Sequence, residues 1–364
     1  MSASDARRYV TVDGRFEMLH GAIENPTIAY ETWGQPASAG DNAALLFTGL
    51  SPSAHAASSP DDPTSGWWED MIGPDKPIDT SRLYVVCVNS LGSCFGSTGP
   101  ASERREGGTY RLDFPVLTLE DIARAGHAVV EHLGLARLKA VVGPSMGGMT
   151  ALAYAILHPG HAEGLVSISA AARSLPFSIA LRSLQRELIR SDPAWANGKY
   201  AYDAPPVLGM RLARKLGMIT YRSAKEWSGR FGRERATDDL AVGARFDIDF
   251  EIESYLEAHA NKFIGTFDAN CYLYLSRAMD LFDVADHGGS VEAGLARIKA
   301  ERALIVGVET DFLFPLQQQR ELAEGLQPTV GDVDFHALPS IQGHDSFLVD
   351  MDRFRPVVAQ FFEG

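Results

Sequence analysis

The order of apolar and polar residues predicts alternating strands and helices in the first half of the chain. Short apolar runs that end in turn residues, as buried strands do, occupy residues 43–50, 83–92 and 139–143. Apolar residues recur at helical spacing over 119–135 and 150–159. Strands that alternate with helices build a parallel sheet with helices on its faces. We therefore predict an α/β protein with a mostly parallel sheet flanked by helices.

The pattern changes after residue 173, where strand-like runs nearly disappear and helical spacing dominates. The strand pattern returns at 303–311 and 333–340, and an amphipathic helix pattern follows at 353–362. These segments predict one sheet domain that is interrupted by an inserted helical lid. The predicted parts are a core of residues 1–173 and 275–364 and a lid of residues 174–274.

Composition and charge narrow the class of protein further. The 364 residues are 45% apolar and 22% charged, ordinary values for a globular protein with a large core. The formal net charge of −14 disfavours nucleic acid and anionic membranes as partners, although a local basic pocket could still bind an anionic substrate. No apolar run approaches the roughly 20 residues of a membrane span, and the first residues lack the apolar stretch of a signal peptide.

The cysteines bear on the compartment. Cys87, Cys94 and Cys271 have neither the spacing of a metal site nor that of a disulfide framework. Sparse cysteines of this kind are typical of a reducing compartment. We therefore expect a cytoplasmic protein without a metal ion, in which Cys94 is a small buried thiol.

The strongest chemical signal is GPSMGG at residues 143–148, which fits G-x-S-x-G with Ser145 at its centre. In the α/β-hydrolase fold, the serine of this motif sits on a strained turn from strand to helix where only small neighbours fit. The same pentapeptide also occurs by chance in ordinary tight turns. Here a predicted strand precedes it and a predicted helix follows it, so we predict that Ser145 is a nucleophile.

A serine hydroxyl becomes a good nucleophile only when a base accepts its proton. In the α/β-hydrolase fold an acid and then a histidine follow the serine, each on a loop after a later strand. Asp311 ends a predicted strand, and His344 lies between the last predicted strand and the last helix. The competing assignments are His55 for the base, Asp345 or Asp350 for the acid, and a helix cap or turn for Asp311.

Acyl chemistry also needs N–H donors that stabilise the oxyanion of the tetrahedral intermediate. In this fold one donor is the backbone N–H that follows the nucleophile, here that of Met146. The second comes from the loop after an early strand, which is TGLSP at residues 48–52. We predict that the N–H of Leu50 is the second donor.

Several long segments resemble the homoserine O-acyltransferases, a family within the α/β-hydrolase superfamily. The resemblance runs from about residue 29 to the C-terminus. It rests on GWWEDMIGP (66–74), NSLGSCFGSTGPAS (89–102), LDFPVLTLEDIARA (112–125), GPSMGGM (143–149), ARKLGMITYRS (213–223) and QGHDSFLVD (342–350). Segments this long and specific are not explained by a shared fold alone.

One departure from the family pattern is informative. Homoserine enzymes of this family usually carry T-G-D-S-H after the early strand, where this chain reads TGLSPSAH. Together with VCVNSLGSC and LPFSIALRSLQRE, this loop is most similar to the serine O-succinyltransferase branch. The resemblance implies that Gly49, Leu50, Ser51 and Pro52 form the specificity region. Serine is one methylene shorter than homoserine, a difference that a pocket discriminates by only about 1–3 kcal/mol.

The resemblance also implies roles for single residues. Ser145 would take the acyl group from acyl-CoA, and His344, oriented by Asp311, would deprotonate first Ser145 and then the amino-acid hydroxyl. Arg214 would bind the carboxylate of L-serine or L-homoserine, and Asp345 would hold its ammonium group. Acyl-CoA, which is succinyl-CoA in this branch, would be a co-substrate, with no further cofactor. Family members are often dimers through their lids, which implies a homodimer.

A succinyl group carries a distal carboxylate, which calls for a cation. Arg182 and Arg186 lie at i, i+4 spacing on one predicted helical face. We favour Arg182 as the residue that recognises the acyl group, against the alternative that both are solvated surface residues. Arg230, Arg233 and Arg235 form a second basic cluster, which fits either the CoA phosphates or a solvated lid surface.

Other functions remain open from the sequence. A homoserine O-acetyl- or O-succinyltransferase would use the same machinery on another substrate. A carboxylesterase would hydrolyse small esters without an amino-acid acceptor, which would leave Arg214 and Asp345 without a role. A non-catalytic binding protein would not need three chemically matched residues in the right order. For Trp67 and Trp68 we expect packing rather than substrate contact.

Overall fold

The computed structural model describes residues 6–236 and 247–363 of the chain. Its centre is an eight-stranded sheet with the strand order β1-β4-β8-β5-β9-β10-β11-β12. Neighbouring strands from β8 to β12 in this order run parallel, whereas β4 pairs antiparallel with both β1 and β8. The predicted mostly parallel α/β sheet is therefore confirmed, with an antiparallel edge that the sequence pattern did not specify.

The strands of the main sheet are β1 (Arg8–Thr11), β4 (Thr27–Trp33), β5 (Ala43–Phe47), β8 (Tyr84–Val88), β9 (Leu138–Pro144), β10 (Ala162–Ile168), β11 (Arg302–Val308) and β12 (Asp332–Leu338). Two small pairs stand apart from it, β2 (Arg15–Met18) with β3 (Gly21–Glu24) and β6 (Ile72–Gly73) with β7 (Ile78–Asp79). The helices around the sheet are α1 (Leu119–His132), α2 (Met146–Leu157), α8 (Val291–Leu295), α9 (Leu316–Leu326), α10 (Ser346–Val349) and α11 (Met351–Glu363).

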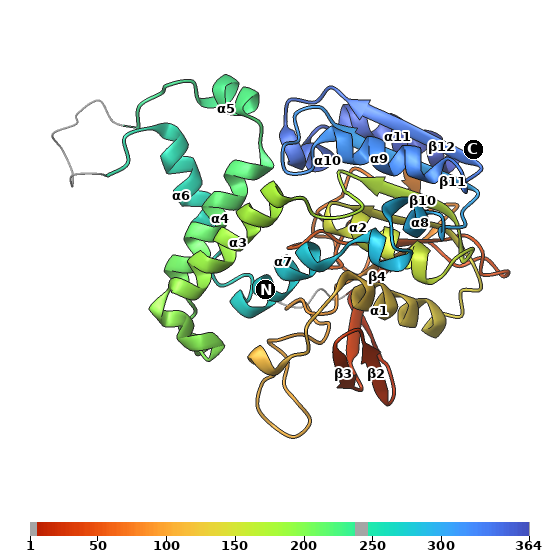
Figure 1. Cartoon of the computed structure of the whole chain (residues 1–364), viewed down its shortest axis with the longest axis horizontal. Coiled ribbons are helices and arrows are strands. Elements are labelled where there is room, and N and C mark those ends of the chain that lie inside the picture. Colours follow the sequence, from red (N-terminus) through yellow and green to blue (C-terminus); the bar gives the residue numbers. More distant parts are fainter. Residues whose placement is uncertain (1–5, 237–246, 364) are drawn as a thin grey trace.

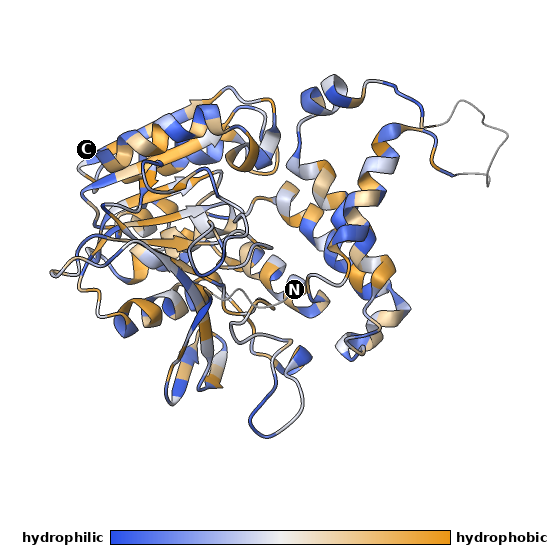
Figure 2. Ribbon diagram, turned by 180° about the vertical axis from the view of Figure 1, so that it is seen from behind, coloured by the Kyte–Doolittle hydropathy of each residue, from blue (hydrophilic) through white to orange (hydrophobic). Residues whose placement is uncertain are grey.

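The sheet separates two apolar clusters, one on each of its faces. On β5, Leu45 and Phe47 belong to the cluster that includes α1 and α2, whereas Ala44 and Leu46 belong to the cluster that includes α11. Successive side chains of a strand point to opposite faces, so a strand covered on both sides is apolar throughout. Figure 2 shows this as mainly apolar colouring along the central strands.

A run of helices lies between β10 and β11 in the sequence and beside the sheet in space (Figure 1). It consists of α3 (Pro176–Ser191), α4 (Val207–Tyr221), α5 (Ala224–Phe231), α6 (Glu251–Phe263) and α7 (Ala269–Leu281). In this run α3 packs on α4 and α7, and α4 packs on α6. The described residues form no strand of the main sheet between β10 and β11. The division into a core and a lid at residues 174–274 stays a prediction, and α7 extends through its second boundary.

The described residues also form short 3₁₀ helices at Arg111–Asp113, Pro193–Gly198, Val284–His287 and Gly343–Asp345. Within residues 6–236 and 247–363, no helix combines the length and the apolarity that crossing a bilayer requires.

Several strands end earlier than their apolar runs predict. The runs 43–50, 83–92 and 303–311 continue three or four residues beyond the ends of β5, β8 and β11. After β11 the chain turns at once, because the N–H of Asp311 donates to the carbonyl of Val308. The excess residues form loops at the carboxyl edge of the sheet, where ligands of open α/β sheets bind.

Candidate active site

Ser145 occupies a tight turn between β9, which ends at Pro144, and α2, which begins at Met146. Its φ of 56° lies in the left-handed region, which side-chain-bearing residues rarely adopt and which costs about 1–3 kcal/mol. The backbone N–H of Ser145 donates to the carbonyl of Ile168 on the neighbouring strand over 2.8 Å. This turn lifts the Ser145 hydroxyl above the sheet edge, as the motif predicted.

The glycines of the motif are required by close packing. A Cβ on Gly143 would lie 2.1 Å from the carbonyl of Gly147, on the other side of the turn. A Cβ on Gly147 would lie 2.2 Å from the carbonyl oxygen of Phe47 at the end of β5. Both contacts are far inside van der Waals distance and both involve backbone, so neither neighbour can move aside cheaply. The G-x-S-x-G spacing therefore follows from how β9, α2 and β5 meet.

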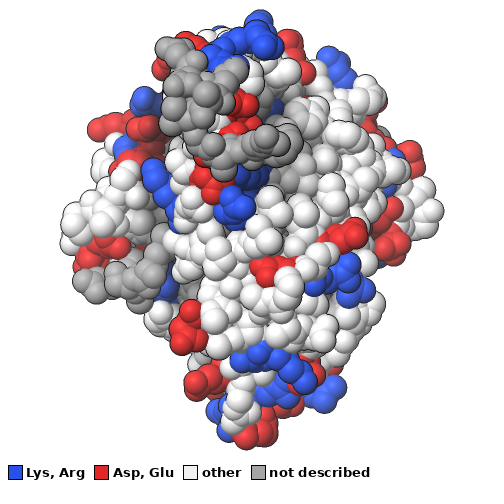
Figure 3. Space-filling model, turned by 90° about the vertical axis from the view of Figure 1, so that its left-hand side faces the viewer, with Lys and Arg blue, Asp and Glu red and all other residues white. Residues whose placement is uncertain are grey.

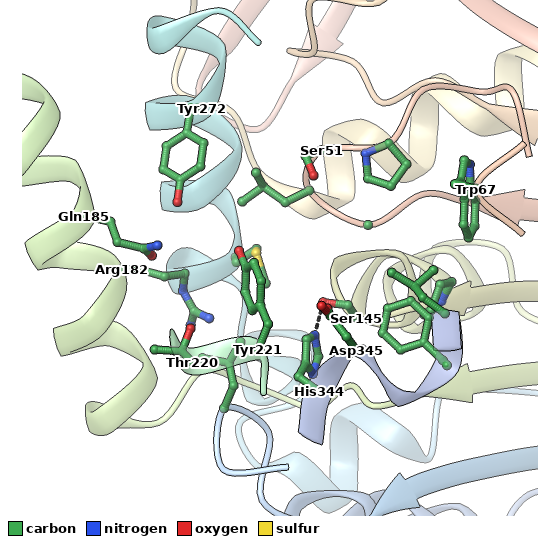
Figure 4. A pocket seen from close by; sticks show the side chains of 18 residues that line it. Ser51, Trp67, Ser145, Arg182, Gln185, Thr220, Tyr221, Tyr272, His344 and Asp345 are labelled. Carbon is green, nitrogen blue, oxygen red and sulfur yellow. Dashed lines mark hydrogen bonds between the residues drawn. The ribbon is translucent and has the colours of Figure 1, made fainter. Parts of the chain in front are cut away.

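Asp311 and His344 reach Ser145 from the loops after β11 and β12. His344 Nδ1 lies 2.7 Å from Asp311 Oδ2, and His344 Nε2 lies 2.8 Å from Ser145 Oγ (Figure 4). The other carboxylate oxygen of Asp311 accepts the N–H groups of Leu313 and Phe314, each over 2.9 Å. The structure therefore brings the three residues together in one hydrogen-bonded chain.

The contacts of His344 define its tautomer. A carboxylate can only accept a hydrogen bond, so Nδ1 carries a proton and donates a hydrogen bond to Asp311. The lone pair of Nε2 then faces the Ser145 hydroxyl. Burial by itself lowers the pKa of His344, but the charge and the hydrogen bond of Asp311 outweigh it and raise that pKa above the usual 6.5. The ring also stacks on Phe314, with 5.1 Å between centroids. His344 is thus held as a base that takes up a proton readily.

The rival residues have other partners. His55 Nδ1 lies 2.8 Å from Glu31 Oε2, and His55 Nε2 lies 2.9 Å from the carbonyl of Thr64. Asp350 receives two hydrogen bonds from Arg353. These contacts use the groups that a general base or an orienting acid would need, so geometry favours His344 and Asp311.

The predicted oxyanion donors come from two different elements near the nucleophile. Met146 is the first residue of α2, where the backbone N–H has no partner within the helix and the helix dipole favours an anion. The loop of Gly49, Leu50, Ser51 and Pro52 lines the same pocket as Ser145. The sheet edge therefore places the predicted specificity loop next to the reacting hydroxyl.

The walls of this pocket come from the core and from the helical run together. Arg182 and Gln185 project from α3, Thr220 and Tyr221 come from the end of α4, and Tyr272 comes from α7 (Figure 4). The core supplies Ser145, His344, Asp345 and the apolar side chains of Leu313, Phe347 and Leu348. The pocket thus joins a nucleophile on the core to polar side chains on the helices.

The two predicted acyl-recognition arginines are placed differently. Arg182 lines the pocket and is 4% exposed, whereas Arg186 does not line it. Both contact the carboxylate of Asp280 on α7, Arg182 through Nε at 2.6 Å and Arg186 through Nη1 at 2.7 Å. The alternative that both arginines are solvated surface residues is therefore wrong for Arg182.

The two residues predicted to bind the amino acid are also separated. Asp345 lines the pocket, while Arg214 lies outside the lining, with its guanidinium 4.5 Å from the ring centre of Phe263 and 5.9 Å from that of Tyr221. Asp345 instead pairs with Arg222, whose Nε lies 3.4 Å from Oδ2. Burial raises the pKa of Asp345, and the positive charge of Arg222 opposes the rise only in part.

Sequence reasoning missed Arg222, although it belongs to the quoted segment ARKLGMITYRS. It follows the last residue of α4 and also donates to Gln342 over 2.8 Å, just before the 3₁₀ helix that carries His344. Nothing in the spacing distinguished it from Arg214, because its partners lie more than a hundred residues away. Tyr221 was missed for the same reason.

The second basic cluster lies elsewhere. Arg230 stacks on the ring of Tyr255 at 4.3 Å, and both Arg233 and Arg235 lie over the ring of Phe250. Arg230 and Arg235 line a separate hollow that they share with Glu234 and Glu251. These contacts fit the surface of the predicted lid better than a site where the three arginines converge on the CoA phosphates.

Trp67 and Trp68 also differ in their position relative to the pocket. Trp67 and Trp68 stack with 5.3 Å between ring centres, and Trp68 is buried and donates to the carbonyl of Phe347. Trp68 is therefore a packing residue, as expected. Trp67 lines the pocket, which corrects the expectation that neither residue borders the substrate site.

Comparison with known proteins agrees with this geometry. The family model described as the alpha/beta hydrolase fold matches residues 53–340, so the chain belongs to the α/β-hydrolase fold family. It is 58% identical over 360 residues to the serine O-succinyltransferase of Litchfieldella anticariensis, with 98% of each chain covered. It is also 58% identical over 346 residues to that of Stenotrophomonas maltophilia, with 94% of each covered. Within the fold family, the chain groups with these acyltransferases.

Solved structures with the same fold include proteins of two activities. A crystal structure of an esterase aligns with a TM-score of 0.88 and 30% identity over 98% of this chain and 99% of its own. The homoserine O-acetyltransferase of Bacillus anthracis aligns with a TM-score of 0.89 and 26% identity over 98% of this chain and 97% of its own.

Proposed function

We propose that the chain is a serine O-succinyltransferase, which moves the succinyl group of succinyl-CoA to the hydroxyl of L-serine in the synthesis of cysteine. The observation that carries this proposal is the hydrogen-bonded chain from Ser145 through His344 to Asp311, in a pocket that also contains Arg182. These three hydrogen-bonded residues activate Ser145 as a nucleophile, and Arg182 suits an acyl group that ends in a carboxylate. The names of the relatives support the same reaction.

In the first half-reaction, Ser145 Oγ attacks the thioester carbon while His344 Nε2 takes the hydroxyl proton. The N–H groups of Met146 and Leu50 stabilise the oxyanion. Collapse of the intermediate breaks the carbon–sulfur bond, and the CoA thiolate leaves with the proton from His344. The product is a succinyl ester on Ser145.

In the second half-reaction, His344 takes the proton of the serine hydroxyl, whose oxygen attacks the ester carbon. Collapse breaks the ester bond to Ser145 Oγ, which takes the proton back from His344, and O-succinylserine is released. Asp345 would hold the ammonium group of the substrate, which requires its pair with Arg222 to open. Arg214 would bind the carboxylate. It lies against Tyr221 outside the pocket lining, so this role requires a side-chain movement.

The test is a matrix of two acceptors and two donors, L-serine and L-homoserine against succinyl-CoA and acetyl-CoA. We expect the highest kcat/KM for serine with succinyl-CoA. A maximum for homoserine with either donor would replace the proposal by a homoserine O-acyltransferase. Because one methylene is worth only about 1–3 kcal/mol, measurable homoserine turnover is compatible with the proposal.

A carboxylesterase is the second candidate, because an esterase is among the structures with the same fold. An esterase would hydrolyse a small ester, such as p-nitrophenyl acetate, at a rate that does not respond to an added amino acid. We expect the reverse for this chain: slow hydrolysis of succinyl-CoA in water alone, and rapid release of CoA when L-serine is present. The helical run would keep water from the acyl ester.

We also propose that the protein is a cytoplasmic homodimer. Free Cys87, Cys94 and Cys271 fit a reducing compartment. On the side of the molecule formed by the helical run, Figure 3 shows a broad area without charged residues. Exposed Leu184 of α3 and Ile219 of α4 are apolar side chains on this run. Exposed apolar surface is typical of an interface.

A further inference from the structure

Asp280 on α7 is shared by the two arginines of α3. Its Oδ1 accepts from Arg182 Nε over 2.6 Å, and its Oδ2 lies 2.7 Å from Arg186 Nη1. The side chains of Arg182 and Asp280 are only 5% and 8% exposed. Two guanidinium groups and one carboxylate leave these three side chains with one net positive charge. A buried charge of this kind is costly unless a further anion compensates it.

Ser174 is the second anchor of Arg182. Arg182 Nη2 donates to Ser174 Oγ over 2.6 Å, and the Ser174 hydroxyl donates in turn to the carbonyl of Met279 over 2.8 Å. The proton of the hydroxyl is thus used, and its lone pair is turned toward Arg182. With Nε and Nη2 both engaged, the plane of the guanidinium is fixed by contacts from two directions.

The third guanidinium nitrogen of Arg182, Nη1, differs from the other two in its hydrogen bonding. Nη1 is buried and has no hydrogen-bond partner within the described part of the chain. Arg182 lines the pocket that contains Ser145, and Figure 4 shows its guanidinium among the side chains of Thr220 and Tyr221. Buried donors are nearly always satisfied, so an unsatisfied one beside a pocket indicates an acceptor supplied by a ligand.

We propose that Asp280 is a positioning residue for acyl-donor specificity, which with Ser174 holds Arg182 so that Nη1 meets the distal carboxylate of a dicarboxylic acyl group. The inference rests on the proposed function, since it takes Ser145 as the acyl acceptor and Arg182 as the group that reads the acyl chain. Asp280 offsets one of the two arginine charges and leaves the other for the ligand. An acetyl group has no carboxylate and gains nothing from this arrangement.

A purely structural role for Asp280 makes a different prediction. Its contacts also tie α3 to α7, so its loss would loosen the wall of the pocket as a whole. Loosening would reduce turnover of every acyl donor alike. A positioning role changes the ratio of kcat/KM for succinyl-CoA to that for acetyl-CoA, and this ratio is the quantity to measure.

The main test is a double-mutant cycle of Asp280→Ala and Arg182→Ala, with L-serine as the acceptor. We expect Asp280→Ala to lower the succinyl-to-acetyl ratio by about 10- to 100-fold, the range for losing a hydrogen bond to a charged group. In the Arg182→Ala background the second substitution should leave the ratio within about twofold, because Asp280 acts through Arg182. An unchanged or increased ratio in Asp280→Ala, or equal effects in both backgrounds, would overturn the inference.

Removal of Asp280 leaves two buried arginines together and could prevent folding. Ser174→Ala provides the second variant, because it removes one neutral contact of Arg182 and leaves the ion pair intact. We expect a smaller fall in the same ratio, in a protein whose circular dichroism spectrum is that of the wild type. No change in the ratio for Ser174→Ala would also count against the inference.

Glu257→Ala is the matched control. Glu257 on α6 likewise bridges two cations of one helix, Arg211 and Lys215 of α4, but none of the three lines the pocket. Its loss should leave the ratio unchanged. The wild-type assay distinguishes the proposed function from the role of Asp280. Failure of the wild-type protein to use succinyl-CoA would reject the proposed function. Normal use of succinyl-CoA with an unaltered ratio in the Asp280 variant would reject only the role of Asp280.

Discussion

At the scale of single residues, the site depends on a serine in a backbone conformation that side-chain-bearing residues rarely adopt. The structure contains a natural comparison for it. Ser169, directly after the neighbouring strand β10, also has a positive φ, of 47°, and is buried, but its hydroxyl has no hydrogen-bond partner among the described residues. Backbone strain alone therefore does not make a nucleophile, and the histidine contact is what distinguishes Ser145.

We predict that Ser145→Ala lowers acyl transfer by at least about 1,000-fold, because the attacking oxygen is lost while the fold is kept. Release of CoA from succinyl-CoA in the presence of L-serine measures the loss, and circular dichroism checks the fold. Ser169→Ala is the control and should retain most of the activity. Substantial transfer by a folded Ser145→Ala protein would rule out the ester intermediate.

The pKa of His344 makes a second residue-scale prediction. Protonation of Nε2 removes the lone pair that accepts the Ser145 proton, so acylation needs the neutral ring. Because Asp311 raises that pKa above 6.5, the rate of acylation should rise with pH through a midpoint above 6.5. The initial burst of CoA release without L-serine measures this step alone, free of the titration of Asp345.

Asp311→Asn tests the cause of that midpoint. The charge that raises the pKa of His344 is lost, so the midpoint should move to lower pH, and the rate should fall by about 10,000-fold because the tautomer is no longer fixed. A wild-type midpoint at or below 6.5, or no shift in the variant, would mean that another group controls the profile.

At the scale of elements, the turn between β9 and α2 is set by how closely α2 approaches β5. We predict that Gly147→Ala lowers the free energy of unfolding by about 1–3 kcal/mol and also reduces activity, since its Cβ would lie 2.2 Å from the carbonyl oxygen of Phe47. Urea unfolding measures the change. Gly229→Ala on α5 is the matched control, because its Cβ would have nothing within 4 Å and should stabilise the helix by about 0.5–1 kcal/mol. Similar effects of the two substitutions would contradict the packing argument.

The elements also show what the sequence predicts and what it does not. The sheet, the turn at Ser145 and the order of Asp311 and His344 follow from local patterns, because each depends on neighbours in the chain. The pairing of Asp280 with Arg182 does not, since it joins two helices whose contact is decided only by folding. Arg214 shows a limit of family resemblance. The segment around it matches a family, but the match does not reveal that Arg214 lies outside the pocket lining.

At the scale of the whole molecule, the proposed homodimer gives a direct prediction. Leu184→Glu combined with Ile219→Glu should convert a dimer into a monomer, because both are exposed apolar side chains of the helical run. Light scattering after gel filtration measures the mass. Leu19→Glu, at an exposed leucine near the β2–β3 pair, is the control and should leave the mass unchanged. A monomeric wild-type protein, or a dimer that survives both substitutions, would refute this interface.

The position of the helical run in the sequence has a consequence for how proteins of this family can change their acyl donor. The run leaves the sheet after β10 and returns before β11, so it lies between the strand that precedes Ser145 and the loops that carry Asp311 and His344. The reacting residues and the acyl-binding pair of Arg182 and Asp280 are therefore carried on separate stretches of chain that meet at one pocket. Variation in α3 or α7 can redirect the enzyme to a new acyl donor while the reactive centre remains as it is.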